Sequence, residues 1–279
     1  MTVVSIVNMK GGVAKTTLAT NLADILARRE ECSVLLVDLD PQFNAMQCLL
    51  SGEEYVDRRT KGGLTIVSIF DDAPAPIVSA VVPPQPGAKI PLKDIRPWQI
   101  KPRFDLVPGD LELYRLEMGG GQGREQRLKR YLEAIDAENH YDFVIIDTPP
   151  TPSAWMMAAL LASDGYVVPV KPEPLSRTGI DLLRGVVERC SQNYGHPVQC
   201  FGVVLTIVET NTLVFKDAKR FLDENAVWRG KRFQSVLPKR TALAAGQGNQ
   251  QLILDLPDET MKLALVGIAR EFLEKFDNG

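Results

Sequence analysis

The stretch "VVSIVNMKGGVAKTTL", from Val3 to Leu18, decides the fold of this chain. Its apolar first part, residues 3–7, predicts a buried strand, and the pattern that begins near Lys15 predicts a helix. Between them lies a turn with two glycines, two lysines and two threonines. Such a turn aims backbone N–H groups and a helix N-terminus at one point, which is an arrangement that binds phosphate. We therefore predict a polyphosphate-binding loop at the end of the first strand.

The residue types in this loop suit that task. Gly11 and Gly12 let the backbone curl tightly with no Cβ in the way. Lys15 is placed to reach the β- and γ-phosphates, and Thr16 to offer its hydroxyl to Mg²⁺. A glycine-rich turn that only caps a helix is the alternative interpretation, and the complete pattern K-G-G-x-x-K-T-T makes it the weaker one.

The loop departs from the ordinary G-x-x-x-x-G-K-[ST] pattern in two ways. Met9 and Ala14 stand where that pattern has glycine, and an additional lysine, Lys10, precedes the two glycines. The loop favours a positive φ at residue 14, and we expect alanine to be small enough to adopt it.

Carboxylates follow two later apolar runs. "VLLVDLDPQ" ends a predicted strand with Asp38 and Asp40, and "FVIIDTPP" ends another with Asp147. Ligands bind at the carboxyl ends of the strands in open α/β sheets, and phosphoryl transfer needs groups that hold a metal and orient water. Each aspartate alone could simply cap the next helix or turn. The three together with the loop favour a metal-supported phosphate site.

Short apolar runs alternate with helical patterns along the chain, which predicts an α/β fold: a doubly wound, mostly parallel sheet with helices on both faces. The predicted strands are residues 3–7, 33–38, 104–109, 142–147, 165–170, 201–206 and 233–238. The predicted helices are residues 15–29, 124–138, 153–162, 175–192, 212–225 and 258–276. We expect a single domain over 1–279, interrupted by an irregular, proline-rich insertion at about 71–102.

The composition excludes several classes of protein. The 279 residues carry a formal net charge of -3, so only a local basic patch could bind nucleic acid. None of the four cysteines has metal-finger spacing, which favours reduced thiols in a cytoplasmic protein. The sequence shows no signal peptide and no apolar run of membrane-spanning length, so we expect no membrane association.

The three motifs in this order, KGGxxKTT, D-x-D-P-Q and IIDTPP, resemble the ParA/MinD group of deviant Walker A ATPases. The segments 104–117, 163–183 and 236–246 resemble the same group, so the likeness covers most of the chain. Within the group the chain is most similar to ParA partition proteins of the short type, and we expect no N-terminal helix-turn-helix domain.

The resemblance implies a cycle of ATP-dependent dimerisation and slow, partner-stimulated hydrolysis with Mg²⁺. It implies that Lys10 crosses to the phosphates of the other subunit, that Lys15 acts in its own site and that Asp40 orients the attacking water. Asp38 and Asp147 would support the metal, which Thr16 binds. The nucleotide-binding residues would be Lys10, Gly11, Gly12, Val13, Ala14, Lys15, Thr16 and Thr17. The implied partners are a second copy, non-specific DNA and a ParB-like adaptor, which places the protein on the nucleoid in plasmid or chromosome partition.

A candidate DNA surface lies between residues 211 and 240, a segment that contains eight basic and only three acidic residues. Lys216, Lys219 and Arg220 share one predicted helix face, and Lys239 and Arg240 follow later. Contacts from such residues to phosphates would be salt-sensitive and independent of sequence. A solvated helix face is the alternative interpretation.

We weigh three other functions, of which the last, the nitrogenase-type iron protein, is discounted. A related ATPase that positions a non-DNA cargo would have the same core. A MinD-like, membrane-cycling ATPase needs a basic amphipathic C-terminal helix, whereas residues 261–279 are mixed in charge and are expected to pack on the sheet. A nitrogenase-type iron protein needs cluster cysteines, and none lies between Cys48 and Cys190.

Overall fold

The computed structural model describes residues 1–71, 90–118, 123–173 and 176–276. Its centre is a sheet of eight strands in the order β3-β4-β2-β5-β1-β6-β7-β8. The strands are β1 (Thr2–Ile6), β2 (Val34–Asp38), β3 (Trp98–Lys101), β4 (Phe104–Val107), β5 (Phe143–Asp147), β6 (Gly165–Val170), β7 (Gln199–Val208) and β8 (Leu237–Pro238). Every neighbouring pair is parallel except β3 with β4, which confirms the predicted mostly parallel sheet.

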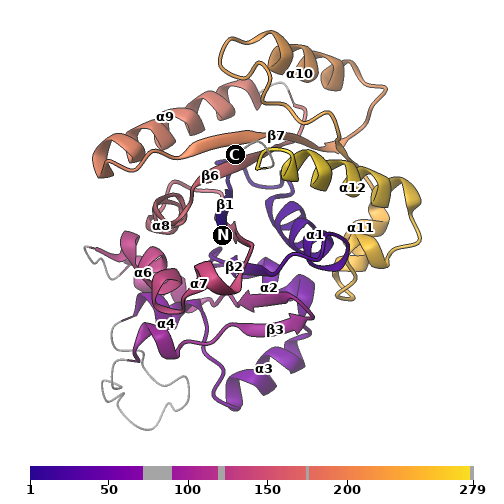
Figure 1. The fold of residues 1–279 in the computed structure, drawn as a ribbon. Helices are drawn as coiled ribbons and strands as arrows, with labels where there is room; N and C mark the ends of the chain where they lie inside the picture. The colour runs from indigo at the N-terminus through magenta and orange to yellow at the C-terminus, as the bar shows by residue number, and fades with distance from the viewer. Residues whose placement is uncertain (72–89, 119–122, 174–175, 277–279) are drawn as a thin grey trace.

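Helices cover both faces of this sheet (Figure 1). They are α1 (Lys15–Arg28), α2 (Asn44–Leu49), α3 (Gly52–Thr60), α4 (Ile66–Phe70), α5 (Glu112–Met118), α6 (Arg127–Ala134), α7 (Ala137–His140), α8 (Ala154–Ala162), α9 (Ser176–Tyr194), α10 (Leu213–Glu224), α11 (Thr241–Gln247) and α12 (Glu259–Leu273). Short 3-10 turns occur at Leu92–Asp94, Arg124–Gln126 and Ile253–Asp255.

The alternation of side chains along the strands explains why both faces need helices. Leu36 of β2 belongs to the core that Leu22 of α1 and Phe272 of α12 complete. Its neighbour Leu35 points the other way, into the core that contains Tyr131 of α6. All five residues of β2 are buried, as they are in a parallel strand covered on both sides.

Three sequence predictions need correction. The end of the segment at 71–102 is not irregular, because β3 lies there and pairs antiparallel with β4 at the edge of the sheet; residues 72–89 of that segment lie outside the described residues. The strand predicted at 233–238 is shorter and consists of β8 alone. Phe233 N donates to Val203 O of β7, but Phe233 itself lies in a loop and not in a strand. The helix predicted at 124–138 is divided into a 3-10 turn, α6 and α7.

Candidate nucleotide and magnesium site

The sheet order brings the predicted loop and carboxylates together. β5 lies between β1 and β2, and the register pairs Ile6 with Asp147 and Asp38 with Asp147. The loop that follows β1 therefore begins beside the two aspartates, at the carboxyl edge of the sheet. This is the edge at which open α/β sheets bind ligands.

The loop has the conformation that the sequence predicted. Gly12 has a φ of 70°, and Ala14 has a φ of 63° and a ψ of 37°, in the left-handed region. A Cβ added to Gly11 or Gly12 would meet no atom within 4 Å. The outer side of both glycines is therefore open, which leaves their backbone accessible to a ligand.

Two polar side chains that the sequence analysis missed tie the loop to neighbouring strands. The Asn8 amide donates to Pro169 O of β6 at 2.8 Å and its oxygen accepts from Lys10 N at 2.9 Å. The Thr206 hydroxyl of β7 donates to Val13 O at 2.8 Å. A polar residue directly after a buried strand was the available signal for Asn8; nothing local marked Thr206.

Lys15 starts α1 and folds back over the loop. Its Nζ donates to Lys10 O at 3.3 Å, and only 7% of the residue is exposed. Burial lowers the pKa of Lys15, and this effect outweighs the nearby charges of Asp147 and Asp40, which raise it. Further along the helix, the Thr17 hydroxyl accepts from the Gln247 amide at 3.0 Å.

Asp38 and Asp147 are buried carboxylates whose bonding is incomplete. Asp147 Oδ2 accepts from the Thr16 hydroxyl at 2.7 Å, and Asp38 Oδ2 accepts from Met46 N at 2.8 Å. The Oδ1 atom of each is buried without a hydrogen-bond partner. Burial raises the pKa of Asp147 to about 7 and that of Asp38 well above its ordinary value.

These observations fit Mg²⁺. The partnerless buried oxygens of Asp38 and Asp147, with the Thr16 hydroxyl beside Asp147, are hard oxygen groups that a divalent cation or its waters would satisfy. Within the described ranges, no cluster of three or more His, Cys, Asp or Glu side chains could hold a metal alone. Magnesium that keeps waters and shares the phosphates of a nucleotide needs no such cluster.

Asp40 lies two residues beyond Asp38 and is also buried. Its Oδ1 accepts from Gln42 N at 2.9 Å, which fixes the side chain at the start of the turn. Burial raises the pKa of Asp40, whereas the bond from Gln42 and the charge of Lys15 lower it. The carboxylate thus stands near the lysine of the loop without an ion-pair contact to it.

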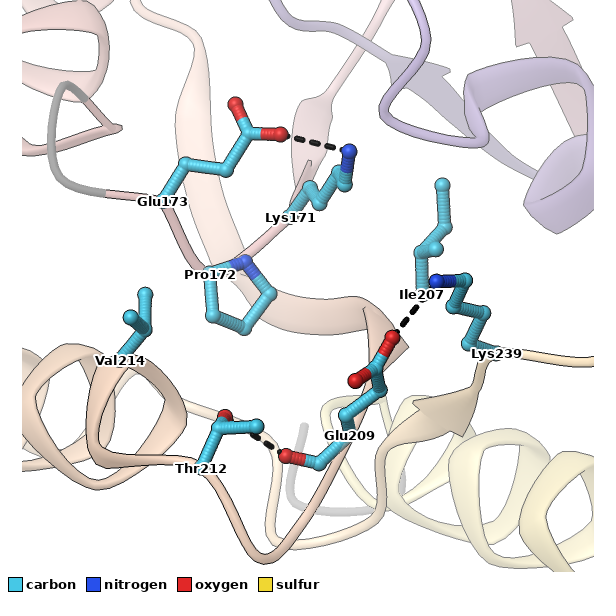
Figure 2. Close-up of a pocket in the computed structure, with 8 residues that line it drawn as sticks. All are labelled: Lys171, Pro172, Glu173, Ile207, Glu209, Thr212, Val214 and Lys239. Carbon is cyan, nitrogen blue, oxygen red and sulfur yellow. Dashed lines mark hydrogen bonds and ion pairs between the residues drawn. The ribbon is translucent and has the colours of Figure 1, made fainter.

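Lys10 differs from Lys15 in exposure and in partner. Its side chain is 40% exposed, and Nζ forms an ion pair with Glu173, which follows β6. Glu173 also pairs with Lys171 at 2.6 Å (Figure 2). The bond from Lys10, which has the larger effect, and the bond from Lys171 lower the pKa of Glu173 to about 2. Glu173 lines a pocket of about 250 Å³ with Glu209 and others between the ends of β6 and β7 and the start of α10.

The predicted DNA residues lie on two elements. Lys216, Lys219 and Arg220 are exposed on α10, whereas Lys239 and Arg240 follow β8. Three of the five are in ion pairs: Arg220 with Asp217, Lys239 with Glu209 at 2.6 Å, and Arg240 with Asp258 at 3.1 Å.

Comparison with known proteins agrees with this geometry. Residues 1–199 match the model of a family described as an AAA domain. The chain is 33% identical to the chromosome partitioning protein ParA of Caulobacter vibrioides over 278 residues, which cover 96% of this chain and 94% of that protein.

Two solved structures share the fold. A putative plasmid partition protein from Borrelia burgdorferi bound to AMPPNP is 21% identical, with a TM-score of 0.74 over 99% of this chain and 98% of its own. A cobyrinic acid a,c-diamide synthase from Mycobacterium smegmatis, with an ATP analogue and magnesium, is 21% identical, with a TM-score of 0.71 over 99% and 96%. The fold thus occurs with more than one activity, whereas the ParA relative matches nearly end to end. With its loop, its carboxylates and this relative, the chain belongs to the ParA family of P-loop ATPases.

Proposed function

We propose that this protein is a nucleotide-gated switch that drives DNA partition. Two copies pair when each holds ATP and Mg²⁺, and hydrolysis separates them. The observation that carries the proposal is the contrast between the two lysines of the loop. Lys15 is buried over its own loop, whereas the Lys10 side chain is 40% exposed at the rim and pairs with Glu173, a partner that it can exchange for the phosphates of a second copy.

The site residues then have distinct tasks. Lys15 and the backbone of residues 10–17 bind the phosphates of their own subunit, and Lys10 adds charge to those of the partner. Thr16, Asp38 and Asp147 hold Mg²⁺, which when bound neutralises charge on the β- and γ-phosphates. Asp40 orients the attacking water. Because Lys10 completes the site only in the pair, turnover is slow until dimerisation and an adaptor promote it.

The paired state is proposed to bind DNA through the basic residues of α10 and of the segment after β8, without sequence preference. The ParB-like adaptor would stimulate hydrolysis and so release the protein from the nucleoid. The relatives named for chromosome and plasmid partition support this cargo. A related ATPase that positions another cargo would use the same switch and would differ in its surface alone.

A membrane-cycling role has less support. α12 packs its aromatic residues inside the molecule: the Phe272 ring lies 5.4 Å from that of Phe143 in β5. No helix in the parts of the chain that the structure describes is long and apolar enough to span a bilayer.

Sedimentation of the protein with and without DNA, in ATP, in ADP and without nucleotide, tests the proposal. We expect dimers and DNA binding only with ATP, and we expect Lys10→Ala to abolish both while ATP still binds. Lys171→Ala is the matched control, because Lys171 pairs with the same glutamate. DNA binding that ignores nucleotide would contradict the switch, and ATP-dependent binding to anionic vesicles would favour the membrane-cycling alternative.

A further inference from the structure

The segment that follows β4 lies directly against Asp38. A Cβ added to Gly109 would stand 2.8 Å from both Cγ and Oδ2 of Asp38 and 2.6 Å from Cβ of Phe43. Side chains never approach so closely, so only glycine fits at this position. The backbone of Gly109 is therefore one wall of the space that the Asp38 carboxylate occupies.

This wall is held from its other side by the segment around α3 and α4. Pro108 O accepts from Ile66 N at 2.9 Å. Gly109 O accepts from the Tyr55 hydroxyl at 3.4 Å. The two donors, Ile66 and Tyr55, belong to a part of the chain that contributes no residue to the nucleotide loop.

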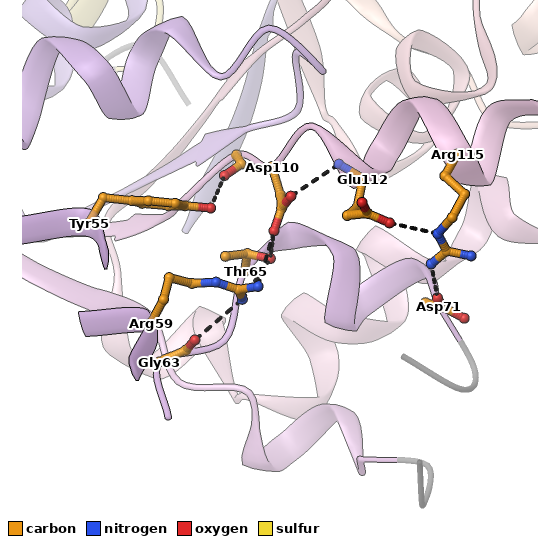
Figure 3. A network of polar contacts seen from close by, with 9 residues as sticks. Tyr55, Arg59, Gly63, Thr65, Asp71, Asp110, Glu112 and Arg115 are labelled. Carbon is orange, nitrogen blue, oxygen red and sulfur yellow. Dashed lines mark hydrogen bonds and ion pairs between the residues drawn. The ribbon is translucent and has the colours of Figure 1, made fainter. Parts of the chain in front are cut away.

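Asp110 is the centre of this support (Figure 3), and only 8% of the residue is exposed. Its Oδ2 accepts from the Thr65 hydroxyl at 2.9 Å and forms an ion pair with Arg59 at 3.4 Å. Its Oδ1 accepts from Glu112 N at 3.0 Å, at the start of α5. The carboxylate thus fixes its own backbone to α3, to the residue before α4 and to α5 at once.

We propose that Asp110 is a positioning residue for the magnesium site: Arg59 and Thr65 hold Asp110, and Asp110 holds Gly109 against Asp38. Gly109 lies on the side of Oδ2, the oxygen that accepts from Met46 N, whereas Oδ1 is the oxygen without a partner. Supporting residues outside the ligand set fix the ligands of a metal in this way. The inference rests on the proposed role of Asp38 in holding Mg²⁺.

The test measures binding of a fluorescent ATP analogue as Mg²⁺ is titrated into metal-free protein. Thr65→Val removes the hydroxyl bonded to Asp110, and Thr65→Ser restores it. Asp110→Asn removes the charge that pairs with Arg59, and Gly109→Ala places a methyl group against Asp38. The affinity measured in EDTA reports the nucleotide loop without the metal.

Two matched controls separate positioning from general stability. Arg115→Gln breaks the side-chain ion pairs of Arg115 with Asp71 and Glu112 but keeps the backbone bond from Glu112 N to Asp110. Gly52→Ala adds a methyl group where no atom lies within 4 Å. Neither change touches the wall beside Asp38.

We expect Thr65→Val, Asp110→Asn and Gly109→Ala to raise the half-saturating Mg²⁺ concentration about 10- to 100-fold. Thr65→Ser and both controls should match the wild type, and the affinity in EDTA should not change in any variant. A half-saturating concentration within twofold of the wild type in the folded variants would overturn the inference, as would an equal loss of affinity with and without Mg²⁺. If Gly109→Ala does not fold, the Thr65 pair decides. Wild-type binding that ignores Mg²⁺ would instead refute the proposed metal site itself.

Discussion

Ala14 holds the loop in a conformation that costs an alanine about 1 kcal/mol, because its Cβ crowds the backbone in the left-handed region. Glycine would relieve that crowding, but it has more conformational entropy in the unfolded chain to lose on folding, and the two effects are similar in size. Ala14→Gly should therefore leave the free energy of unfolding within about 0.5 kcal/mol of the wild type. In contrast, Ala264→Gly, in the middle of α12, should lower it by about 1 kcal/mol. Urea denaturation of both variants checks this, and equal losses would show that Ala14 carries no strain.

Glu173 holds Lys10 on its own subunit, so the pair competes with the proposed contact across the dimer. Glu173→Gln should favour ATP-dependent dimerisation, by no more than about fivefold because the pair is exposed. Glu209→Gln breaks the neighbouring pair with Lys239 in the same pocket and is the matched control (Figure 2). Sedimentation velocity in ATP measures the dimer dissociation constant. A weaker dimer would mean that Glu173 serves the interface itself.

At this scale the sequence predicts what is local. Lys15 and Thr16 are recognisable because the motif places them at fixed spacing, and Asp147 because it ends a buried run. Glu173 and Asp110 were missed because their contacts join residues 163 and 45 positions apart in the chain. Only the sheet topology brings these residues to their partners.

Among the elements, strands with long apolar runs were predicted correctly and edge strands were not. β3 carries a proline immediately before and after it, at residues 97 and 102, which reads as a break in the pattern. An edge strand tolerates such prolines because one side of its ladder needs no partner. β8 was overestimated because the apolar residues at 233–237 pack in the core without extended pairing.

α12 packs against the sheet through one buried face. Phe272 is fully buried and lies 5.1 Å from the ring of Phe276 and 5.4 Å from that of Phe143, between the helix and the sheet. Phe272→Ala should lower the free energy of unfolding by about 3–5 kcal/mol, since it leaves a cavity that the sheet cannot fill. Leu263→Ala, on the exposed face of the same helix, should change it by less than about 0.5 kcal/mol. Guanidinium denaturation measures both, and a small effect of Phe272→Ala would show that α12 is not part of the cooperative core.

For the whole molecule, the buried carboxylates make stability depend on pH in the opposite direction from most aspartates. Burial raises the pKa of Asp147 to about 7, whereas the unfolded chain titrates near 3.8. Between these values the folded protein binds more protons than the unfolded chain, so the free energy of unfolding falls as pH rises. The raised pKa values of Asp38 and Asp40 act in the same direction.

Metal-free, nucleotide-free protein should therefore lose on the order of a few kcal/mol of stability between about pH 5 and pH 8. Asp147→Asn, which keeps a bond to Thr16 but cannot ionise, should reduce that loss. Denaturation in EDTA across this range measures the slope in both proteins. Stability that rises with pH would show that these carboxyl groups are ionised and solvated in the folded state.

The charge of the molecule as a whole opposes DNA binding, since its net charge is -3. The proposed DNA binding must then come from a local surface whose cations are free to meet phosphates. On α10, Lys216 and Lys219 are exposed, and among the described residues neither has an ion-pair partner, whereas Arg220 is paired with Asp217. These two lysines should carry more of the DNA contact than the paired residues Arg220, Lys239 and Arg240.

The double variant Lys216→Ala/Lys219→Ala should weaken ATP-dependent DNA binding at low salt, equally for DNA of any sequence. It should also reduce the slope of log affinity against log salt by about 2, since each lost phosphate contact lowers that slope by about 0.9. Lys129→Ala on α6, away from α10 in Figure 1, removes an exposed charge and should leave the slope unchanged. Fluorescence anisotropy in an ATP analogue at several salt concentrations measures all three proteins. An unchanged slope in the double variant would remove α10 from the interface, and the cations after β8 would then have to exchange their carboxylate partners for phosphates.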